Sequence, residues 1–183
     1  MTTIIATRTK ILSDGKVTVG SRIDSINTKK VRNVSGYLIG GAGRYSSILT
    51  FFDWYQQNLL CQDAQSMIPG LSIMDDSKED EQFTALVVHP DGVIYLHEGS
   101  NPSRAYPLDV DYYAIGSGAD FALAALKGGA TPEEAMEVAK QMDVFSGGET
   151  FVEELEEKIE LTRESFESKT KKEILDTFFP KEG

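Results

Sequence analysis

The chain has 183 residues and a formal net charge of −11, because 29 acidic residues outnumber 18 basic ones. This length corresponds to about one domain of roughly 100–200 residues, which is long enough to bury a hydrophobic core. The acidic balance argues against a nucleic-acid partner and against a membrane surface, since both attract basic faces.

Cysteine and histidine are too scarce for most metal and disulfide chemistry. Cys61 is the single cysteine, which excludes an intramolecular disulfide, and His89 and His97 are the two histidines. We therefore expect no metal site. No apolar run approaches the roughly 18 residues of a membrane span, and the N-terminus lacks the pattern of a signal peptide. A soluble, cytoplasmic protein is expected.

Strand patterns dominate the first part of the chain. β-branched or alternating residues predict strands, which we expect at 3–7, 10–13, 16–19 and 37–43. Apolar residues spaced three and four apart then predict a helix over 44–60.

Turn and cap signals organise the second part. The turn sequence Pro90-Asp91-Gly92 separates two β-rich runs within 83–99 and predicts a hairpin. Thr131 is a candidate N-cap because a proline and two glutamates follow it. The other elements expected here are a strand at 112–118 and helices at 119–127 and 131–142.

Strands and helices are partly segregated along the chain, which favours an α+β fold over alternating βαβ units. The charged run 75–82 is typical of a solvated loop. From Glu149 onward the residues are charged and mostly helix-forming. We therefore expect one domain over 1–150 and an acidic helical extension over 151–183.

Thr2 is the first candidate for chemistry. Removal of Met1 would expose a threonine that carries both a hydroxyl and a free α-amine. Such an amine has a pKa of about 7.7–8.0, so it can act as general base for its own hydroxyl. The alternative interpretation is that Thr2 simply begins a strand.

Asp14 and Lys30 are the second candidates. A lysine beside an N-terminal threonine would lower the pKa of the amine and favour the alkoxide, and a buried aspartate would hold that lysine. If the first hairpin turns at Arg8 and Thr9, Thr3 pairs with Asp14 beside the N-terminus. Taken alone, Asp14 begins an ordinary turn and Lys30 belongs to an ordinary surface pair.

Two glycine-rich turns could serve a reaction. The run Gly40-Gly41-Ala42-Gly43 between a strand and a helix can present a backbone N–H to an oxyanion. It lacks the following Lys-Ser/Thr of a P-loop. The segment 115–119 has the form G-x-S-x-G only superficially, and both histidines precede it, so a Ser–acid–His order does not follow.

Six short motifs follow one another along residues 2–148. They are Thr2-Thr3-Ile4, Asp14-Gly15-Lys16-Val17-Thr18-Val19-Gly20, Lys29-Lys30-Val31, Leu38-Ile39-Gly40-Gly41-Ala42-Gly43, Ala114-Ile115-Gly116-Ser117-Gly118-Ala119 and Asp143-x-x-Ser146-Gly147-Gly148. In this order they resemble the proteasome β-type N-terminal-nucleophile hydrolases. The nearest resemblance is to the simple bacterial peptidase that works with a hexameric ATP-dependent unfoldase, of which short versions occur in bacterial viruses.

The resemblance implies a catalytic role for each matched residue. Thr2 would be the nucleophile and its amine the base, Lys30 would tune both groups, and Asp14 would orient Lys30. The first hairpin is shorter than in the bacterial peptidase, so this assignment requires a shortening that is symmetrical about the turn. An asymmetric shortening would put Ser21 or Arg22 at the aspartate position.

The resemblance also implies residues around the substrate. Gly40 would donate its N–H to the oxyanion, and Thr18 would pair with the substrate backbone. The residues that would surround the amine and a water are Ser117, Asp143 and Ser146. The residues that would line the pocket for the side chain before the scissile bond are Val17, Thr28, Leu38 and Ala42. Three of these four are apolar, so an apolar preference is expected there.

The fold that the resemblance implies is a four-layer αββα sandwich, and the activity is that of a threonine peptidase inside a homo-oligomeric ring. Protein or peptide substrates and an ATP-dependent unfoldase are the implied partners. No cofactor is required, although the resemblance allows a monovalent cation. Two alternatives stay open: a catalytically inactive assembly module with this fold, and a small-molecule amidohydrolase with the same nucleophile.

Overall fold

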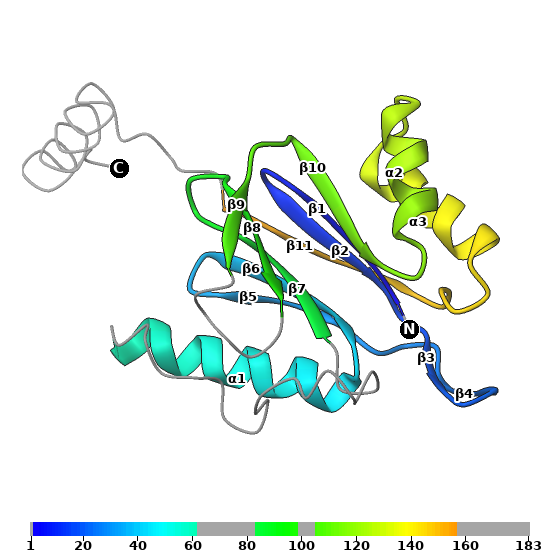
Figure 1. The fold of residues 1–183 in the computed structure, drawn as a ribbon, viewed down its shortest axis with the longest axis horizontal. Coiled ribbons are helices and arrows are strands. Elements are labelled where there is room, and N and C mark those ends of the chain that lie inside the picture. Colours follow the sequence, from blue (N-terminus) through cyan, green and yellow to red (C-terminus); the bar gives the residue numbers. More distant parts are fainter. Residues whose placement is uncertain (1, 62–82, 99–104, 157–183) are drawn as a thin grey trace, which may run out of the picture.

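Two antiparallel sheets lie face to face, with helices on both outer sides (Figure 1). This is the four-layer αββα arrangement expected of the chain. The structure is a computed structural model, and it describes residues 2–61, 83–98 and 105–156. The first sheet consists, in spatial order, of β10 (Tyr112–Gly116), β1 (Thr3–Thr7), β2 (Lys10–Asp14) and β11 (Thr150–Glu154).

The second sheet follows the chain order in space. Its strands are β5 (Val31–Val34), β6 (Tyr37–Gly43), β7 (Phe83–Val88), β8 (Ile94–Glu98) and β9 (Tyr106–Leu108). A separate two-stranded hairpin, β3 (Val17–Val19) and β4 (Arg22–Ser25), projects beyond the sheets beside the N-terminus (Figure 1). The helices are α1 (Tyr45–Cys61), α2 (Ala119–Lys127) and α3 (Pro132–Met142).

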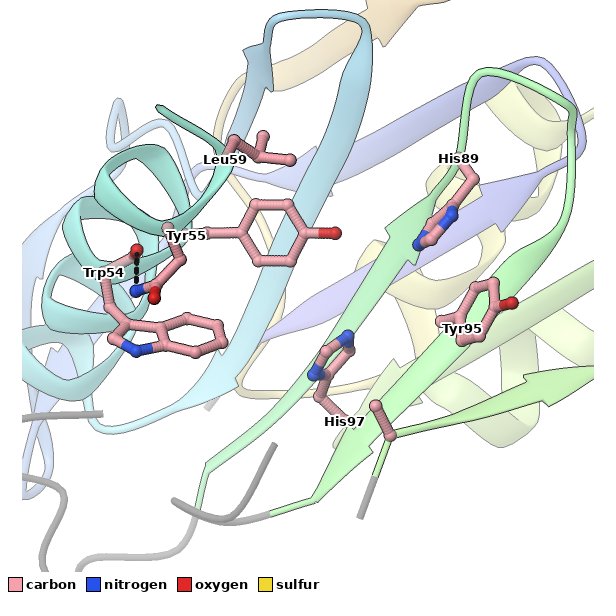
Figure 2. Close-up of a pocket in the computed structure, with 8 residues that line it drawn as sticks. Trp54, Tyr55, Leu59, His89, Tyr95 and His97 are labelled. Atoms are coloured by element: carbon pink, nitrogen blue, oxygen red, sulfur yellow. Dashed lines mark hydrogen bonds between the residues drawn. The ribbon is translucent and has the colours of Figure 1, made fainter. Parts of the chain in front are cut away.

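Each sheet has an outer face that a helical layer covers. α1 lies on the second sheet and turns Ile48, Phe51 and Phe52 toward it, all of them essentially inaccessible to solvent. Trp54 and Tyr55, in the middle of the same helix, line a pocket together with Tyr95 and His97 of β8 (Figure 2). The outer face of the first sheet packs on α2 and α3, which present mostly small side chains. These are Ala122, Leu126, Ala135, Met136 and Ala139.

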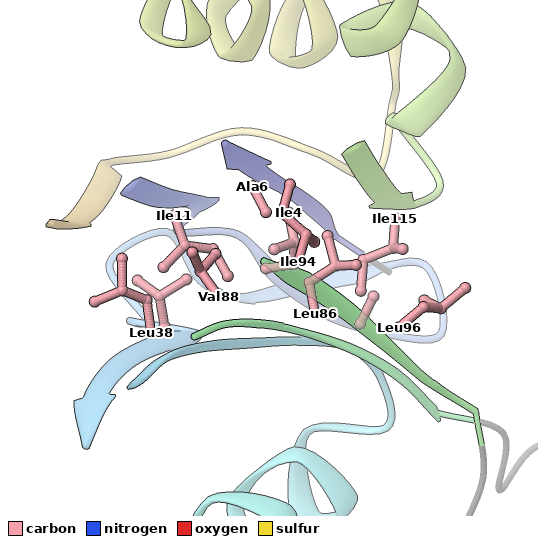
Figure 3. Close-up of a cluster of buried hydrophobic side chains, with 11 residues drawn as sticks. Ile4, Ala6, Ile11, Leu38, Leu86, Val88, Ile94, Leu96 and Ile115 are labelled. Atoms are coloured by element: carbon pink, nitrogen blue, oxygen red, sulfur yellow. The ribbon is translucent and has the colours of Figure 1, made fainter. Parts of the chain in front are cut away.

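The central core lies between the two sheets (Figure 3). Successive side chains of a strand point to opposite faces, so Ile4 and Ala6 of β1 face inward while Ile5 faces α2 and α3. Leu86 and Val88 of β7 meet them from the second sheet. Full burial of such a side chain contributes about 1.5–3 kcal/mol, so this alternation fixes the register of β1.

The register between β1 and β2 decides what lies at the end of the sheet. Ile4 pairs with Ser13 and Ala6 with Ile11, as the turn at residues 8 and 9 predicts. Continuing this register puts Thr3 opposite Asp14, and the Thr3 N–H donates to the Asp14 carboxylate over 3.0 Å. The symmetrical shortening of the hairpin is therefore what the structure has.

Residues 150–154 correct the expectation of a wholly helical C-terminal segment. They form β11, an antiparallel partner of β2, with Thr150 opposite Asp14. The boundary expected at 150 thus falls inside a strand of the first sheet. The remainder of the expected extension and the run 75–82 lie outside the described residues. Within the described ranges, no helix is long and apolar enough to cross a membrane.

Candidate active site

Three polar side chains from three strands or their ends are buried together beside the N-terminus. Thr2, Asp14 and Lys30 are each at most 2% exposed. The Lys30 ammonium donates to the Asp14 carboxylate over 2.7 Å and also to the Thr2 hydroxyl. The Thr2 hydroxyl donates in turn to the same Asp14 oxygen. The cluster joins a hydroxyl, an ammonium and a carboxylate in one closed set of contacts.

The Asp14 carboxylate is held by backbone groups as well as by Lys30. Its second oxygen accepts from the Lys16 N–H over 3.2 Å and from the Gly147 N–H over 3.0 Å. A buried carboxylate with this many donors cannot rotate freely. Asp14 therefore fixes the place of the Lys30 ammonium.

Lys30 has its charge compensated despite its burial. Its ammonium also donates to the Lys16 carbonyl over 2.7 Å. Burial lowers the pKa of Lys30, and the neighbouring Asp14 carboxylate raises it by less than burial lowers it. The pKa of Lys30 thus lies below the ordinary lysine value.

A second polar cluster lies beside the first. The Ser117 and Ser146 hydroxyls each donate to the Asp143 carboxylate over 2.6 Å, and Ser146 also contacts the Thr3 hydroxyl at 2.6 Å. Burial raises the pKa of Asp143, but the hydrogen bonds from the two serines and the Phe145 N–H outweigh it, so the net pKa is lowered. Asp143 is accordingly a carboxylate at neutral pH.

Two glycines of the turn after β10 let this cluster approach the N-terminus. A Cβ on Gly116 would lie 2.0 Å from the Thr2 carbonyl oxygen, and Gly116 has a φ of +93°. A Cβ on Gly118 would lie 2.1 Å from the Thr3 hydroxyl oxygen. No side chain fits either position, so the glycines of this turn serve close packing against β1.

A cavity of about 310 Å³ opens at Thr2. β3 forms one wall, and the end of β6 with the start of α1 forms the other. The residues that line it are Thr2, Val17, Thr18, Val19, Lys30, Gly43, Arg44, Tyr45, Ser46 and Ile48.

Gly40 does not lie at this cavity, which corrects the expected oxyanion donor. It pairs with Val31 on one side and Leu86 on the other, in the interior of the second sheet. A Cβ there would lie 2.8 Å from side-chain atoms of both Ile4 and Ile11. Gly40 is therefore required for packing between the sheets.

Gly43 is the glycine that reaches the cavity. Alternate N–H groups of a strand in an antiparallel sheet point toward the same neighbour. The Gly41 N–H donates to the Lys30 carbonyl over 3.3 Å, so the Gly43 N–H points to that same side. β5 begins at Val31, and no strand of the described chain covers Gly43 there. This N–H therefore points away from β7, and Gly43 lines the cavity together with Thr2.

Comparison with known proteins identifies relatives of this chain. No family model matches the chain. The ATP-dependent protease subunit HslV of Lacticaseibacillus casei (strain BL23) is 30% identical over 174 residues, covering 84% of this chain and 99% of the relative. The chain belongs to the HslV family. HslV of Rhizorhabdus wittichii is 27% identical, covering 85% of this chain and 93% of the relative.

Solved structures agree in fold. HslV of Trypanosoma brucei has a TM-score of 0.61 at 23% identity, covering 84% of this chain and 99% of that chain. A Thiobacillus denitrificans protein named BPH, which has also been solved in complex with epoxomicin, has a TM-score of 0.59 at 18% identity. It covers 85% of this chain and 98% of its own. As a member of the HslV family, the chain is a threonine peptidase of the proteasome β type, and neither alternative is favoured.

Of the four residues expected to line the substrate pocket and the one expected to pair with the substrate backbone, only some lie at the cavity. Val17 and Thr18 line the cavity. Leu38 and Ala42 belong instead to the core between the sheets, because their side chains face inward from β6. Thr28 is half-buried and binds the Gly15 carbonyl through its N–H, outside the cavity lining. Two of the three apolar residues on which the expected apolar preference depends therefore do not line the cavity.

Sequence reasoning missed several residues of the wall. Gly43 and Arg44 end the glycine run, and Tyr45 begins α1. The signal was present, because the motif places this junction directly after the strand. The sequence does not predict the residue of β6 at which pairing with β5 ends.

The two histidines lie elsewhere, in an aromatic pocket between α1 and the second sheet (Figure 2). His97 stands against Phe51 and Tyr55, and His89 stacks on Tyr95 with ring centroids 4.1 Å apart. Burial, and to a smaller extent the neighbouring His89, lowers the pKa of His97 to about 4. Among the described residues, no group of three His, Cys, Asp or Glu side chains could hold a metal ion.

Proposed function

We propose that Thr2 is the catalytic nucleophile once Met1 has been removed. The observation that carries this proposal is the buried Thr2 hydroxyl, which contacts both the Lys30 ammonium and the Asp14 carboxylate. Loss of Met1 gives Thr2 a free α-amine with an ordinary pKa of about 7.7–8.0. A useful fraction of that amine is neutral near physiological pH, so it can serve as base for its own hydroxyl.

The reaction that these groups support is acyl transfer from a peptide amide. The α-amine takes the hydroxyl proton, directly or through a water, while Thr2 Oγ bonds to the amide carbonyl carbon. The carbonyl oxygen becomes an oxyanion, and we assign the Gly43 N–H as its donor in place of Gly40. The proton then passes to the leaving nitrogen, which departs as an amine. Water hydrolyses the ester with the same base and releases the new carboxyl terminus.

Lys30 acts through its charge at the nucleophile. An ammonium in contact with Thr2 Oγ stabilises a developing alkoxide and lowers the pKa of the nearby amine. Asp14 is a positioning residue in this scheme, because its carboxylate holds Lys30 and the Thr3 N–H without reaching the substrate.

Ser117, Asp143 and Ser146 orient the N-terminal residue. The Ser117 hydroxyl lies 3.4 Å from the Thr2 carbonyl oxygen as well as binding Asp143. Ser146 connects the same carboxylate to Thr3. A carboxylate at this place favours a protonated amine after proton transfer and can hold the hydrolytic water.

The proposed working form is a homo-oligomeric ring in the cytoplasm, with an ATP-dependent unfoldase as partner and unfolded protein or peptides as substrate. Support comes from the relatives, which are named as subunits of an ATP-dependent protease. An open peptidase would attack unfolded chains without selection, whereas a ring restricts access. Sedimentation of the purified chain tests this directly, and a monomer at working concentration would contradict it.

The experiment that tests the nucleophile is intact-mass measurement after treatment with an epoxyketone directed at N-terminal threonine. We expect the loss of Met1 and one adduct on Thr2. Thr2→Ala should lose Met1 and form no adduct. Thr50→Ala, on the surface of α1, is the matched control and should react as the wild type does. Retained Met1 with no adduct, in protein made with an active methionine aminopeptidase, would overturn the proposal.

A further inference from the structure

The charged side chains that line the cavity at Thr2 are both positive. Ten residues line it, and the two that carry charge are Lys30 and Arg44. No aspartate or glutamate is among the lining residues, and the first turn of α1 contains no acidic residue. This contrasts with the whole chain, in which acidic residues exceed basic ones and the net charge is −11.

The two cations differ in how they are compensated. Lys30 is paired with the buried Asp14, so that pair carries no net charge into the cavity. Arg44 is exposed, and within the described ranges its guanidinium forms no hydrogen bond or ion pair. Arg44 therefore leaves the cavity with one unbalanced positive charge, and a guanidinium binds a carboxylate through two parallel N–H donors.

The place of Arg44 in the fold is unfavourable for a cation. Its carbonyl accepts from the Ser47 and Ile48 N–H groups, so Arg44 stands at the N-terminal end of α1. That end of a helix carries partial positive charge, so a basic side chain there is electrostatically unfavourable. Residues that break a local rule in this way are expected mainly where function requires them.

The remainder of the wall suits methylene groups. Val17, Val19 and Ile48 contribute apolar surface, and Tyr45 lies beside Arg44. A side chain that occupies this space has both apolar walls and a guanidinium within the same cavity lining. Glutamate has this composition, with two methylene groups that end in a carboxylate.

We infer that Arg44 is a specificity-determining residue that selects a carboxylate side chain, glutamate foremost, immediately before the scissile bond. The inference rests on the proposed role of Thr2. The carbonyl that Thr2 attacks must come within about 3–3.5 Å of Oγ, so the residue that bears it sits at the cavity mouth. Its side chain is the one that enters a cavity lined by Thr2 itself.

The test compares fluorogenic peptide amides that differ only in the residue before the scissile bond: glutamate, its neutral isostere glutamine, or lysine. For the wild type we expect kcat/KM to be at least about tenfold higher with glutamate than with glutamine. Salt should reduce this ratio, because the cavity is open to solvent. A ratio of one or less would overturn the inference.

Variants at Arg44 assign the preference to this side chain. Arg44→Leu should bring the glutamate-to-glutamine ratio close to one, and Arg44→Lys should retain part of it. Arg44→Glu should reverse the order, with lysine cleaved faster than glutamate. Arg8→Gln, which removes an exposed arginine paired with Asp111, is the matched control and should keep the wild-type ratio. An unchanged ratio in Arg44→Leu would overturn the inference.

The epoxyketone adduct separates the two proposals. An adduct on wild-type Thr2 without a preference for glutamate contradicts the specificity of Arg44 and leaves the nucleophile intact. No adduct on the wild type contradicts the nucleophile itself. If Arg44→Leu fails to fold, Arg44→Lys and Arg44→Glu carry the same comparison, since the first should keep part of the preference for glutamate and the second should reverse it.

Discussion

Lys30 and His97 are both buried titratable side chains, but Lys30 has polar neighbours and His97 has aromatic ones. Lys30 contacts a carboxylate, a hydroxyl and a carbonyl oxygen, so a charged group is retained inside the protein. His97 lies among the rings of Phe51 and Tyr55, and burial holds its pKa at about 4, so it is neutral. Burial alone therefore does not mark a reactive site. Polar partners around a retained charge do.

The strongest test of this contrast is removal of the Lys30 charge. Lys30→Met leaves the Asp14 carboxylate buried without its cation, which should lower the free energy of unfolding by about 3–5 kcal/mol. Peptide cleavage should fall by about 10²–10³, the range associated with loss of one group that stabilises developing negative charge. Thermal unfolding and kcat/KM measure the two effects.

Lys29→Met is the matched control for that experiment. Lys29 is the neighbouring lysine, about half exposed, and pairs with Glu153 at the surface. Exposed pairs of this kind contribute about 0–1 kcal/mol, so both stability and cleavage should stay close to the wild type. Equal losses in the two variants would mean that the burial of Lys30 has no special consequence.

The glycines of β6 sharpen the contrast between packing and chemistry within one strand. Gly40→Ala should lower the free energy of unfolding by about 1–3 kcal/mol, because its Cβ meets Ile4 and Ile11. Folded Gly40→Ala protein should still form the epoxyketone adduct on Thr2. Gly128→Ala, at a helix end with a φ of −75°, is the control and should change stability much less. An unaltered unfolding temperature in Gly40→Ala would contradict its packing role.

The smallest expected effect is the pH response of His97. The folded pKa of His97, about 4, lies below its ordinary value of 6.5. Between these two pH values the unfolded chain binds a proton at His97 and the folded chain does not. Stability is complete above pH 6.5 and is lost as the pH falls toward 4, by about 1.4 kcal/mol at pH 5.5. Urea unfolding at pH 7 and at pH 5.5 measures this loss of stability.

His97→Phe provides the comparison for the pH series. It removes the titrating group and keeps an aromatic ring against Phe51, so the loss between pH 7 and 5.5 should shrink by the same amount. His89 lies in the same pocket, and burial lowers its pKa as well, so a smaller residual slope is expected. A slope that is identical in the wild type and in His97→Phe would show that His97 is not buried as a neutral ring.

Local pattern was enough for the residues that a strand register controls. The turn at residues 8 and 9 fixes the pairing of β1 with β2, and that pairing alone brings Asp14 beside Thr2. The helix over 44–60 and the cap at Thr131 were equally readable, and the capping box at Thr131 and Glu134 is present. These features depend on neighbours within a few residues.

Features that depend on distant neighbours were not readable. Gly40 and Gly43 belong to one motif, and their different surroundings arise because β5 begins at Val31, beside Gly40. Residues 150–154 have charged flanks that favour a helix, yet they form a strand because the edge of β2 is available to them. Ion pairs of Lys29 and Lys10 with this strand support the choice.

The first sheet joins the two ends of the described chain. β11 pairs with β2, the Gly147 N–H binds Asp14, and Ser146 contacts Thr3. During synthesis the N-terminal strands emerge first, and their partners in this sheet follow much later along the chain. The polar contacts that hold Asp14 and Thr3 are therefore completed only after residues 146–154 have left the ribosome. A nascent chain that lacks these residues has no assembled reaction centre, so it is not expected to cleave peptides while it is still on the ribosome.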